Sequence, residues 1–243
     1  MPTSATSQAK SSARGEQGNS VRMAFRRIRD LIVRGHLAPG SRIVEADLAQ
    51  ALGVSRTPIR GALHMLQRDG YIVAVSNDSK PRLAVAPLTK DDARELYQMV
   101  GALEGLAARR TDALAKGARV QLTEKLERWN NQLRRLAEAH EADPNLIFDY
   151  DTQFHRLIVE ATAGARLKGM HEAIKPQIER YGRLYATVII DHLGESVREH
   201  EAIIAAIAKG QGEAAEQAVR LNWQHGAERL AKVIVMFGER GRW

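Results

Sequence analysis

The sequence has no cysteine among its 243 residues, and only 5% of its residues are aromatic. The lack of cysteine excludes a disulfide framework and any metal site built on thiolates, so folding does not depend on an oxidising compartment. No run of about 18 uncharged apolar residues occurs, so we expect no membrane-spanning helix and a cytoplasmic location. A glycine-rich phosphate loop, a GxSxG elbow and an HExxH pair are also missing, so no common enzyme motif is present.

The excess positive charge is confined to the first third of the chain. Residues 1–88 hold 13 Lys and Arg against 6 Asp and Glu, whereas the remaining residues hold 23 of each sign. A local basic excess is the electrostatic signature of a module that binds a polyanion. The same excess also suits an ordinary solvated surface, so charge alone does not decide between the two.

The first 88 residues have the pattern of a winged helix-turn-helix. Residues 1–20, rich in Ser, Ala, Thr, Gln and Gly, are expected to form a disordered tail. Apolar spacing predicts helices over 21–35, 45–52 and 55–68, with Gly53 in the tight turn before the third helix. Two strand-like runs, 71–75 and 82–86, predict the hairpin that forms the wing. We therefore expect a DNA-binding domain over 21–88, with helix 55–68 in the major groove.

Polar side chains suited to DNA gather at the start and on one face of helix 55–68. They are Ser55, Arg56, Thr57, Arg60 and His64. Arginine is the natural choice there, because its planar fork can bond guanine O6 and N7, or a phosphate, with two hydrogen bonds. In the wing, Lys80 and Arg82 suit phosphate or minor-groove contact. The alternative, that these are ordinary solvated charges, leaves the turn, the wing and the localised charge unexplained.

Residues 89–240 predict an all-helical antiparallel bundle, so the expected fold is mainly α, with a winged helix-turn-helix followed by a helical domain. Strand-like alternation is absent from this part of the sequence. Glycines and the Asp143–Pro144 pair mark the breaks, and short loops between long helices are typical of a bundle. The expected helices are 90–115, 119–140, 144–162, 165–191, 195–209 and 212–237.

The segment LAQALGVSRTPIRGALHMLQRDG at 48–70 resembles the GntR family of bacterial regulators. The strings LYQMVGALEGLAARR at 96–110 and DTQFHRLIVEATA at 151–163 resemble helices of its FadR-like subfamily, which has an all-helical FCD-type ligand domain. This resemblance covers about residues 21–240 and implies operator contacts at Arg56, Thr57 and Arg60. It implies a homodimer on short palindromic operators that represses metabolic genes and releases DNA when a small carboxylate or related metabolite binds. One departure is Gly61, where the family usually has Glu; glycine weakens a helix by about 1 kcal/mol relative to a good helix former.

A metal site is expected in the helical domain. Asp151 and His155 lie four residues apart on a predicted helix, so both project from one face. The resemblance implies a divalent metal held by such a pair and by one His from each of two later helices. His200 matches the first of these, whereas Asn222 stands at the second and offers a carbonyl oxygen. The four side chains suit Zn, Ni or Mn, with open positions for an effector carboxylate. The alternative is a hydrogen-bonded core pair of Asp151 and His155, with His200 as a buried polar residue.

The effector contacts are harder to place. Many members of the subfamily carry an Arg on the first ligand-domain helix, where it can pair with a carboxylate, but Val100 stands at that position here. Either another cation does that work, or the effector is less acidic or absent. Candidate contacts are Arg156, Arg180, Arg183 and His225, and each arginine also suits an ordinary surface position.

We therefore predict a DNA-binding transcription regulator, a repressor that acts as a homodimer and responds to a small metabolite, without enzyme activity. One alternative is a constitutive DNA-binding dimer whose helical domain only dimerises. The other is a metal-dependent enzyme at the Asp and His cluster, although no general base at a convincing spacing accompanies it.

Overall fold

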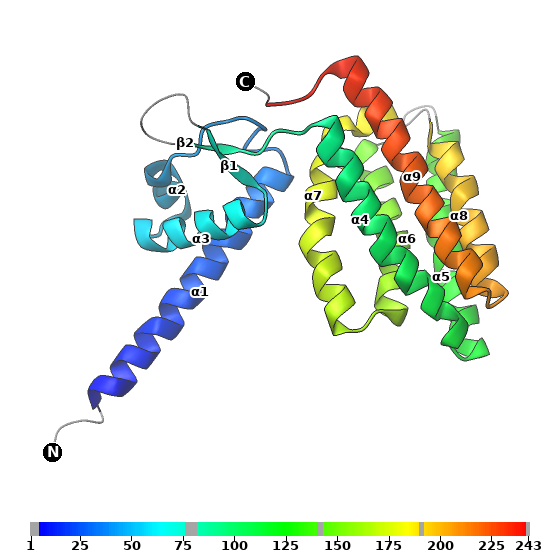
Figure 1. Cartoon of the computed structure of the whole chain (residues 1–243), viewed down its shortest axis with the longest axis horizontal. Coiled ribbons are helices and arrows are strands. Elements are labelled where there is room, and N and C mark those ends of the chain that lie inside the picture. Colours follow the sequence, from blue (N-terminus) through cyan, green and yellow to red (C-terminus); the bar gives the residue numbers. More distant parts are fainter. Residues whose placement is uncertain (1–4, 76–81, 140–142, 190–191, 242–243) are drawn as a thin grey trace. The chain divides into compact units, whose positions relative to one another are not determined.

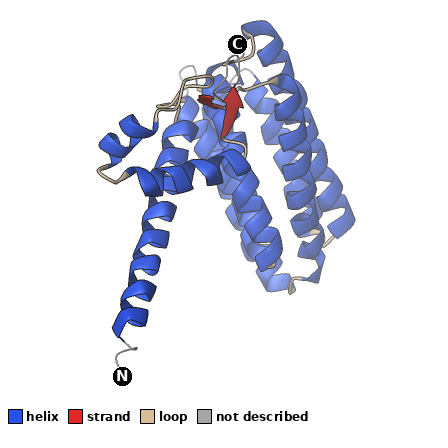
Figure 2. Ribbon diagram, turned by 60° about the vertical axis from the view of Figure 1, so that its left-hand side comes forward, coloured by secondary structure: helices blue, strands red, loops and turns tan. Residues whose placement is uncertain are grey.

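The computed structural model describes the backbone of residues 5–75, 82–139, 143–189 and 192–241, and side chains within 18–75, 82–139, 145–185 and 192–241 together with residue 143. The described residues are mainly helical, with one antiparallel hairpin (Figures 1 and 2). This confirms the predicted fold class. The chain divides into two compact units. The N-terminal unit runs to Pro87 and includes Arg240 and Gly241, and the helical unit is Leu88–Glu239.

The N-terminal unit contains α1 (Ala5–Val33), α2 (Glu45–Leu52), α3 (Arg56–Arg68), β1 (Ile72–Val75) and β2 (Arg82–Val85). α2 ends at Gly53, whose φ of 65° lies in the left-handed region that costs little only for glycine. The chain therefore turns within the few residues between α2 and α3, as the connection of a helix-turn-helix does. Buried apolar side chains form the core of this unit, among them Ile28, Ile59, Leu66, Tyr71 and Ile72.

Two features of the N-terminal unit bear on the sequence predictions: the start of α1 and the glycine at position 61. The disordered tail over 1–20 stays a prediction, although α1 begins at Ala5. No proline interrupts 5–20, and a helix that is anchored by packing at one end extends readily through Ala, Gln and Arg. Gly61 has a packing reason: a Cβ there would lie 3.1 Å from both γ carbons of Val21 on α1. The small residue thus lets α1 and α3 pack closely.

The helical unit is a bundle of long helices that lie side by side (Figures 1 and 2). Its helices are α4 (Lys90–Arg109), the short η1 (Arg110–Ala113), α5 (Lys116–Glu138), α6 (Pro144–Thr162), α7 (Ala165–Ile189), α8 (Leu193–Ala208) and α9 (Gly212–Phe237). The expected helix over 90–115 is thus α4 followed by the separate 3₁₀ turn η1. Thr89 caps α4 by accepting a hydrogen bond from the Asp92 amide at 3.2 Å. None of the described helices is long and apolar enough to cross a membrane.

Glycine on α4 brings α9 unusually close. A Cβ at Gly101 would lie 2.9 Å from Cβ of Trp223 on α9, which is closer than real side chains approach. Gly105, one turn further along α4, faces the side chain of Arg220 at 3.1 Å in the same way. This close packing places the Trp223 indole against buried side chains of α4, where the candidate site begins.

Candidate functional site

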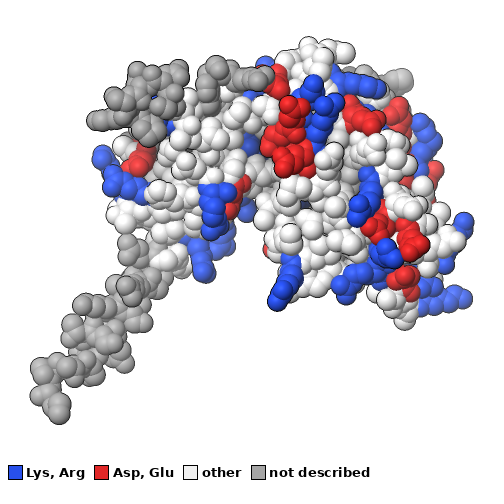
Figure 3. Space-filling model, viewed as in Figure 1, with Lys and Arg blue, Asp and Glu red and all other residues white. Residues whose placement is uncertain are grey.

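The residues predicted to contact DNA are exposed on α3, namely Ser55, Arg56, Thr57, Arg60 and His64. The opposite face of α3 is buried in the core of the N-terminal unit. In the hairpin, Arg82 is exposed at the start of β2, whereas Lys80 lies outside the described residues. Figure 3 shows Lys and Arg side chains along the described surface of this unit, with fewer Asp and Glu among them. The helix therefore turns one side to the core and its arginines to the solvent.

Arg60 already has one partner inside the unit. Its Nε donates to Oε2 of Glu45, the first residue of α2, at 2.8 Å. The hydrogen bond and the negative charge of Glu45 raise the pKa of the Arg60 guanidinium. Since Nε donates to Glu45, the two terminal nitrogens of Arg60 remain available for an outside acceptor. Glu45 thus orients the Arg60 guanidinium and leaves most of the side chain exposed.

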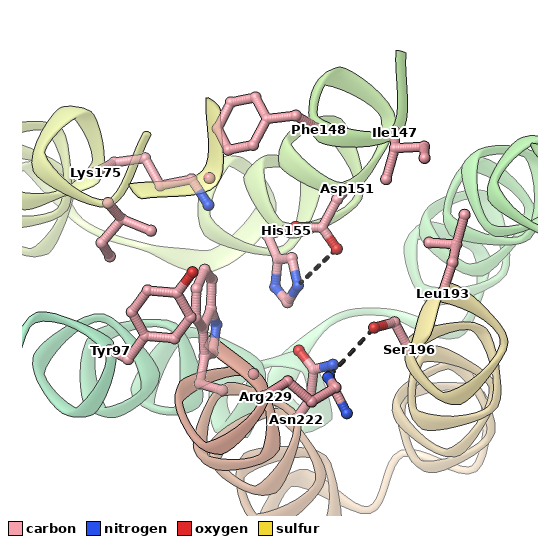
Figure 4. A pocket seen from close by; sticks show the side chains of 14 residues that line it. Tyr97, Ile147, Phe148, Asp151, His155, Lys175, Leu193, Ser196, Asn222 and Arg229 are labelled. Atoms are coloured by element: carbon pink, nitrogen blue, oxygen red, sulfur yellow. Dashed lines mark hydrogen bonds and ion pairs between the residues drawn. The ribbon is translucent and has the colours of Figure 1, made fainter. Parts of the chain in front are cut away.

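The helical unit contains a partly open cavity of about 100 Å³. Side chains from α4, α6, α7, α8 and α9 line it (Figure 4). Polar lining residues are Tyr97, Asp151, His155, Lys175, Ser196, Asn222 and Arg229. Apolar lining residues are Ile147, Phe148, Ile178, Leu193 and Trp223. The cavity therefore combines charged groups with a hydrocarbon wall, as a small-molecule site does.

Three of the predicted metal ligands lie together, and two of them, Asp151 and His155, line this cavity, with His200 beside them. Oδ1 of Asp151 lies 3.6 Å from Nε2 of His200 and 3.9 Å from Nε2 of His155, and the three ligand atoms lie within 4.8 Å of one another. Nε2 of His200 is buried and has no hydrogen-bond partner among the described residues. A buried polar atom without a partner is costly, and a bound cation at this point would satisfy it. The cluster of Asp151, His155 and His200 could therefore hold a metal.

Asn130 on α5 fixes the orientation of His200. The Asn130 amide nitrogen donates to the Val197 carbonyl at 3.0 Å, so its oxygen faces Nδ1 of His200 at 3.2 Å. An acceptor at that position requires the proton on Nδ1, which leaves the lone pair of Nε2 pointing toward Asp151. Burial, with repulsion from His155, lowers the pKa of His200 well below its usual range. A neutral imidazole with its lone pair fixed in this way is a preorganised metal ligand.

Glu104 on α4 orients His155, as Asn130 orients His200. Its carboxylate is fully buried, and Oε2 lies 2.7 Å from Nδ1 of His155, although the contact is poorly aligned for a hydrogen bond. Trp223 Nε1 donates to Oε2 at 2.7 Å, and His171 Nε2 donates to Oε1 at 2.8 Å. Burial alone would raise the pKa of Glu104, but attraction to His155 and Lys175 and these hydrogen bonds hold the pKa well below its usual range. The charged carboxylate favours a proton on Nδ1 of His155, which leaves Nε2 for the side of Asp151.

Asn222 lines the cavity from α9, and its amide is also oriented. Its nitrogen donates to Oε2 of Glu199 at 2.8 Å, so the carbonyl oxygen is the atom left to face the cavity (Figure 4). Glu199 is held in turn by Arg229, whose two terminal nitrogens donate to it at 2.8 and 3.0 Å. His225 Nδ1 also contacts Glu199, at 2.8 Å. Asn222 therefore offers a carbonyl oxygen to the cavity.

The predicted effector contacts lie elsewhere. Arg156 is exposed and pairs with Glu160, Arg183 pairs with Asp149, and none of Arg156, Arg183 and His225 lines the cavity. Arg180 is buried beside Gln177 and does not line the cavity either. The cations that do line it are Lys175 and Arg229.

Sequence reasoning overlooked Glu104, Asn130, Lys175 and Arg229. One signal was available for Glu104. It follows Tyr97 and Val100 at helical spacing, so a carboxylate falls on the apolar face of α4 and requires buried partners.

Comparison with known proteins identifies both units. Residues 21–79 match the gntR family of bacterial regulatory proteins, and residues 95–225 match the FCD domain. The uncharacterized HTH-type transcriptional regulator YdhC of Bacillus subtilis (strain 168) is 31% identical over 212 residues, which cover 86% of this chain and 90% of YdhC.

Two solved structures share the fold. E. coli McbR/YncC superposes with a TM-score of 0.65 at 20% identity, over 88% of this chain and 97% of that one. The transcriptional regulator GntR from Rhodococcus sp. RHA1 superposes with a TM-score of 0.64 at 21% identity, over the same shares of the two chains. With the sequence matches, these findings establish that the chain belongs to the gntR family of bacterial regulatory proteins, as a DNA-binding transcription regulator, not an enzyme, with an N-terminal helix-turn-helix and a C-terminal FCD domain.

Proposed function

We propose that this regulator binds a palindromic operator as a homodimer and represses transcription until a small metabolite enters the cavity of the helical unit. The exposed arginines at the start of α3 support operator reading, because a recognition helix contacts base edges through its N-terminal residues, and Arg56 and Arg60 lie in that part of α3. One such helix reads too few base pairs for genomic specificity, so two copies related by twofold symmetry are required.

The sensing part of the proposal rests on the cavity. A domain that served only to dimerise would have little reason to keep a buried, partnerless Nε2 on His200 beside Asp151. We propose that Asp151, His155, His200 and Asn222 hold Zn, Ni or Mn, since imidazole and oxygen ligands together suit these cations. Bound there, the metal would act as a Lewis acid that attracts an anionic effector. This chain's own residues orient the ligands, through Asn130 and Glu104.

Operator reading is tested by selecting duplexes from a random-sequence library and measuring the affinity of Arg60→Ala for the selected site. The loss of a bidentate base contact should weaken binding about fivefold to 150-fold and relax specificity at one base pair. Arg68→Ala is the matched control, because Arg68 lies in the last turn of the same helix and pairs with Asp69 at 2.9 Å. Equal operator affinity for the wild type and Arg60→Ala would remove α3 from its assigned role.

Dimer formation and sensing have their own measurements. Sedimentation of the free protein and of its operator complex should give two copies per duplex. Binding should fall steeply with salt, because each neutralised phosphate releases counterions. A protein that binds operator identically with every small acid and metal tested would be a constitutive regulator instead.

A further inference from the structure

Lys175 is a buried cation without a hydrogen-bond acceptor among the described residues. Only 8% of the residue is exposed, and it lies in the middle of α7. Its ammonium group lies 4.0 Å from Oε1 of Glu104, too far for a hydrogen bond, and 4.6 Å from the centre of the Trp223 ring. An ammonium carries three N–H donors, and leaving them unpaired in the interior is costly.

Glu104 does not accept a hydrogen bond from the Lys175 ammonium. Its Oε1 already accepts from His171, and its Oε2 accepts from Trp223 and contacts His155. Glu104 therefore balances the charge of Lys175 at a distance but leaves its donors available. The Lys175 side chain lines the cavity and points its nitrogen into it (Figure 4).

The other cation of the cavity is occupied. Arg229 gives both terminal nitrogens to Glu199, and one of them also donates to Ser196 at 3.2 Å. A ligand that bound Arg229 would have to displace Glu199, which also orients Asn222. Lys175 can bind an anion without breaking any hydrogen bond described here.

We propose that Lys175 anchors the carboxylate of a small aliphatic monocarboxylic acid in this cavity. The inference deepens the proposed sensing function and rests on it. A volume of about 100 Å³ is well below the several hundred Å³ of most ligand pockets, which limits the acid to a few carbon atoms. The wall of Ile147, Phe148, Ile178 and Leu193 suits its hydrocarbon part. In the protein without a bound metal, a second carboxylate would meet the negative charges of Asp151 and Glu104, so dicarboxylates should bind more weakly.

The test is calorimetric titration of the full chain with acetate, propionate, butyrate and lactate, with malonate and neutral propionamide as comparison ligands. One or more monocarboxylates should bind saturably, at one site per chain, with and without added Mn²⁺. Propionamide should not bind, because it lacks the charge. The Lys175→Met variant should lose about thirtyfold or more in affinity, since it removes one partner of a buried charge pair.

Two further variants control for folding. Lys175→Arg keeps the charge and should retain part of the affinity, and Lys168→Met on the same helix, outside the cavity, should bind like the wild type. Circular dichroism and thermal unfolding verify that each variant is folded. Binding of no monocarboxylate, equal binding of propionamide, or equal affinity of a folded Lys175→Met would overturn the inference. Because titration needs no DNA, acid binding that leaves operator affinity unchanged would contradict the sensing function and leave the Lys175 site standing.

Discussion

Replacing Asn130 by leucine should weaken metal binding much more than it weakens the fold. Asn130 is 2% exposed and touches no cavity atom itself, but it is the acceptor that keeps the proton on Nδ1 of His200. Leucine has a similar volume and offers no acceptor. Without Asn130, nothing holds the proton on Nδ1 of His200, and the proton can move to Nε2, the nitrogen nearest Oδ1 of Asp151. In that tautomer the proton competes with a metal for the same nitrogen.

The magnitudes follow from the two hydrogen bonds lost. Asn130 also donates to the Val197 carbonyl, which lies inside α8 and keeps its helical hydrogen bond. Losing the hydrogen bond from Asn130 to this carbonyl therefore costs little. The imidazole bears the main cost of about 1–3 kcal/mol for a buried group without its partner, and the tautomer switch moves the result toward the lower end. Removing a residue that orients a metal ligand costs 10-fold to 100-fold in metal affinity, or about 1.4–2.7 kcal/mol.

Three measurements check this reasoning. Denaturant unfolding of the metal-free protein gives the stability change, and titration with Mn²⁺, Ni²⁺ and Zn²⁺ gives the affinity change. Nitrogen NMR of the imidazoles reports the tautomer directly. Asn131→Leu, one residue further along α5 on its exposed side, is the matched control and should leave both quantities unchanged. Unaltered metal affinity in a folded Asn130→Leu protein, or a wild-type spectrum with the proton on Nε2 of His200, would refute the account.

Three other changes have definite expected outcomes. Gly101→Ala should destabilise the protein by about 1–3 kcal/mol in denaturant unfolding, because the new Cβ would lie 2.9 Å from Cβ of Trp223. Its control is Gly169→Ala within α7, where a Cβ would meet no atom within 4 Å, and this change should stabilise the protein by up to about 1 kcal/mol. Asn222→His should raise the affinity ratio of Ni²⁺ or Zn²⁺ to Mn²⁺ in competition titrations, because it exchanges an oxygen ligand for an imidazole; an unchanged ratio would place Asn222 outside the site. Metal at about 100 times its dissociation constant should stabilise the wild type by about 2.7 kcal/mol and a chelator should reverse this, whereas no shift with any of the three cations would argue against a metal site.

Local rules were enough to predict most of the fold. The left-handed glycine after α2, the apolar stripe of α3 and the capping Thr89 are each decided within a few residues of sequence. The extent of α1 is not decided by composition: polar residues argue for a disordered tail over 1–20, while a helix anchored by packing at its other end can extend through the same residues. The residue at which such a helix begins depends on the packing of the segment that follows it, and composition alone does not predict that packing.

The sequence predicts the candidate metal ligands but not the residues that orient them, because the latter lie on other helices. Asp151 and His155 share one helix, so their spacing alone places them together. Asn130 and Glu104 act on the histidines from α5 and α4, and their sequence separations of 70 and 67 residues from His200 and His171 leave no local signal. Residues that orient ligands through space become apparent only when the helices are packed.

The position of the charge in the cavity follows from the same packing. Val100 is fully buried on α4, so an arginine at 100 would have to displace the side chains packed around it. One turn further on, Glu104 holds the Trp223 indole by its Nε1–H, and the face of that ring meets the ammonium of Lys175. The cation thus reaches the cavity from α7, stabilised by a ring and by a carboxylate whose oxygens are already hydrogen-bonded. Under the proposal made above, this packing would supply the anchoring cation from α7 in place of an arginine on α4, and the small volume beside Lys175 would set the selectivity.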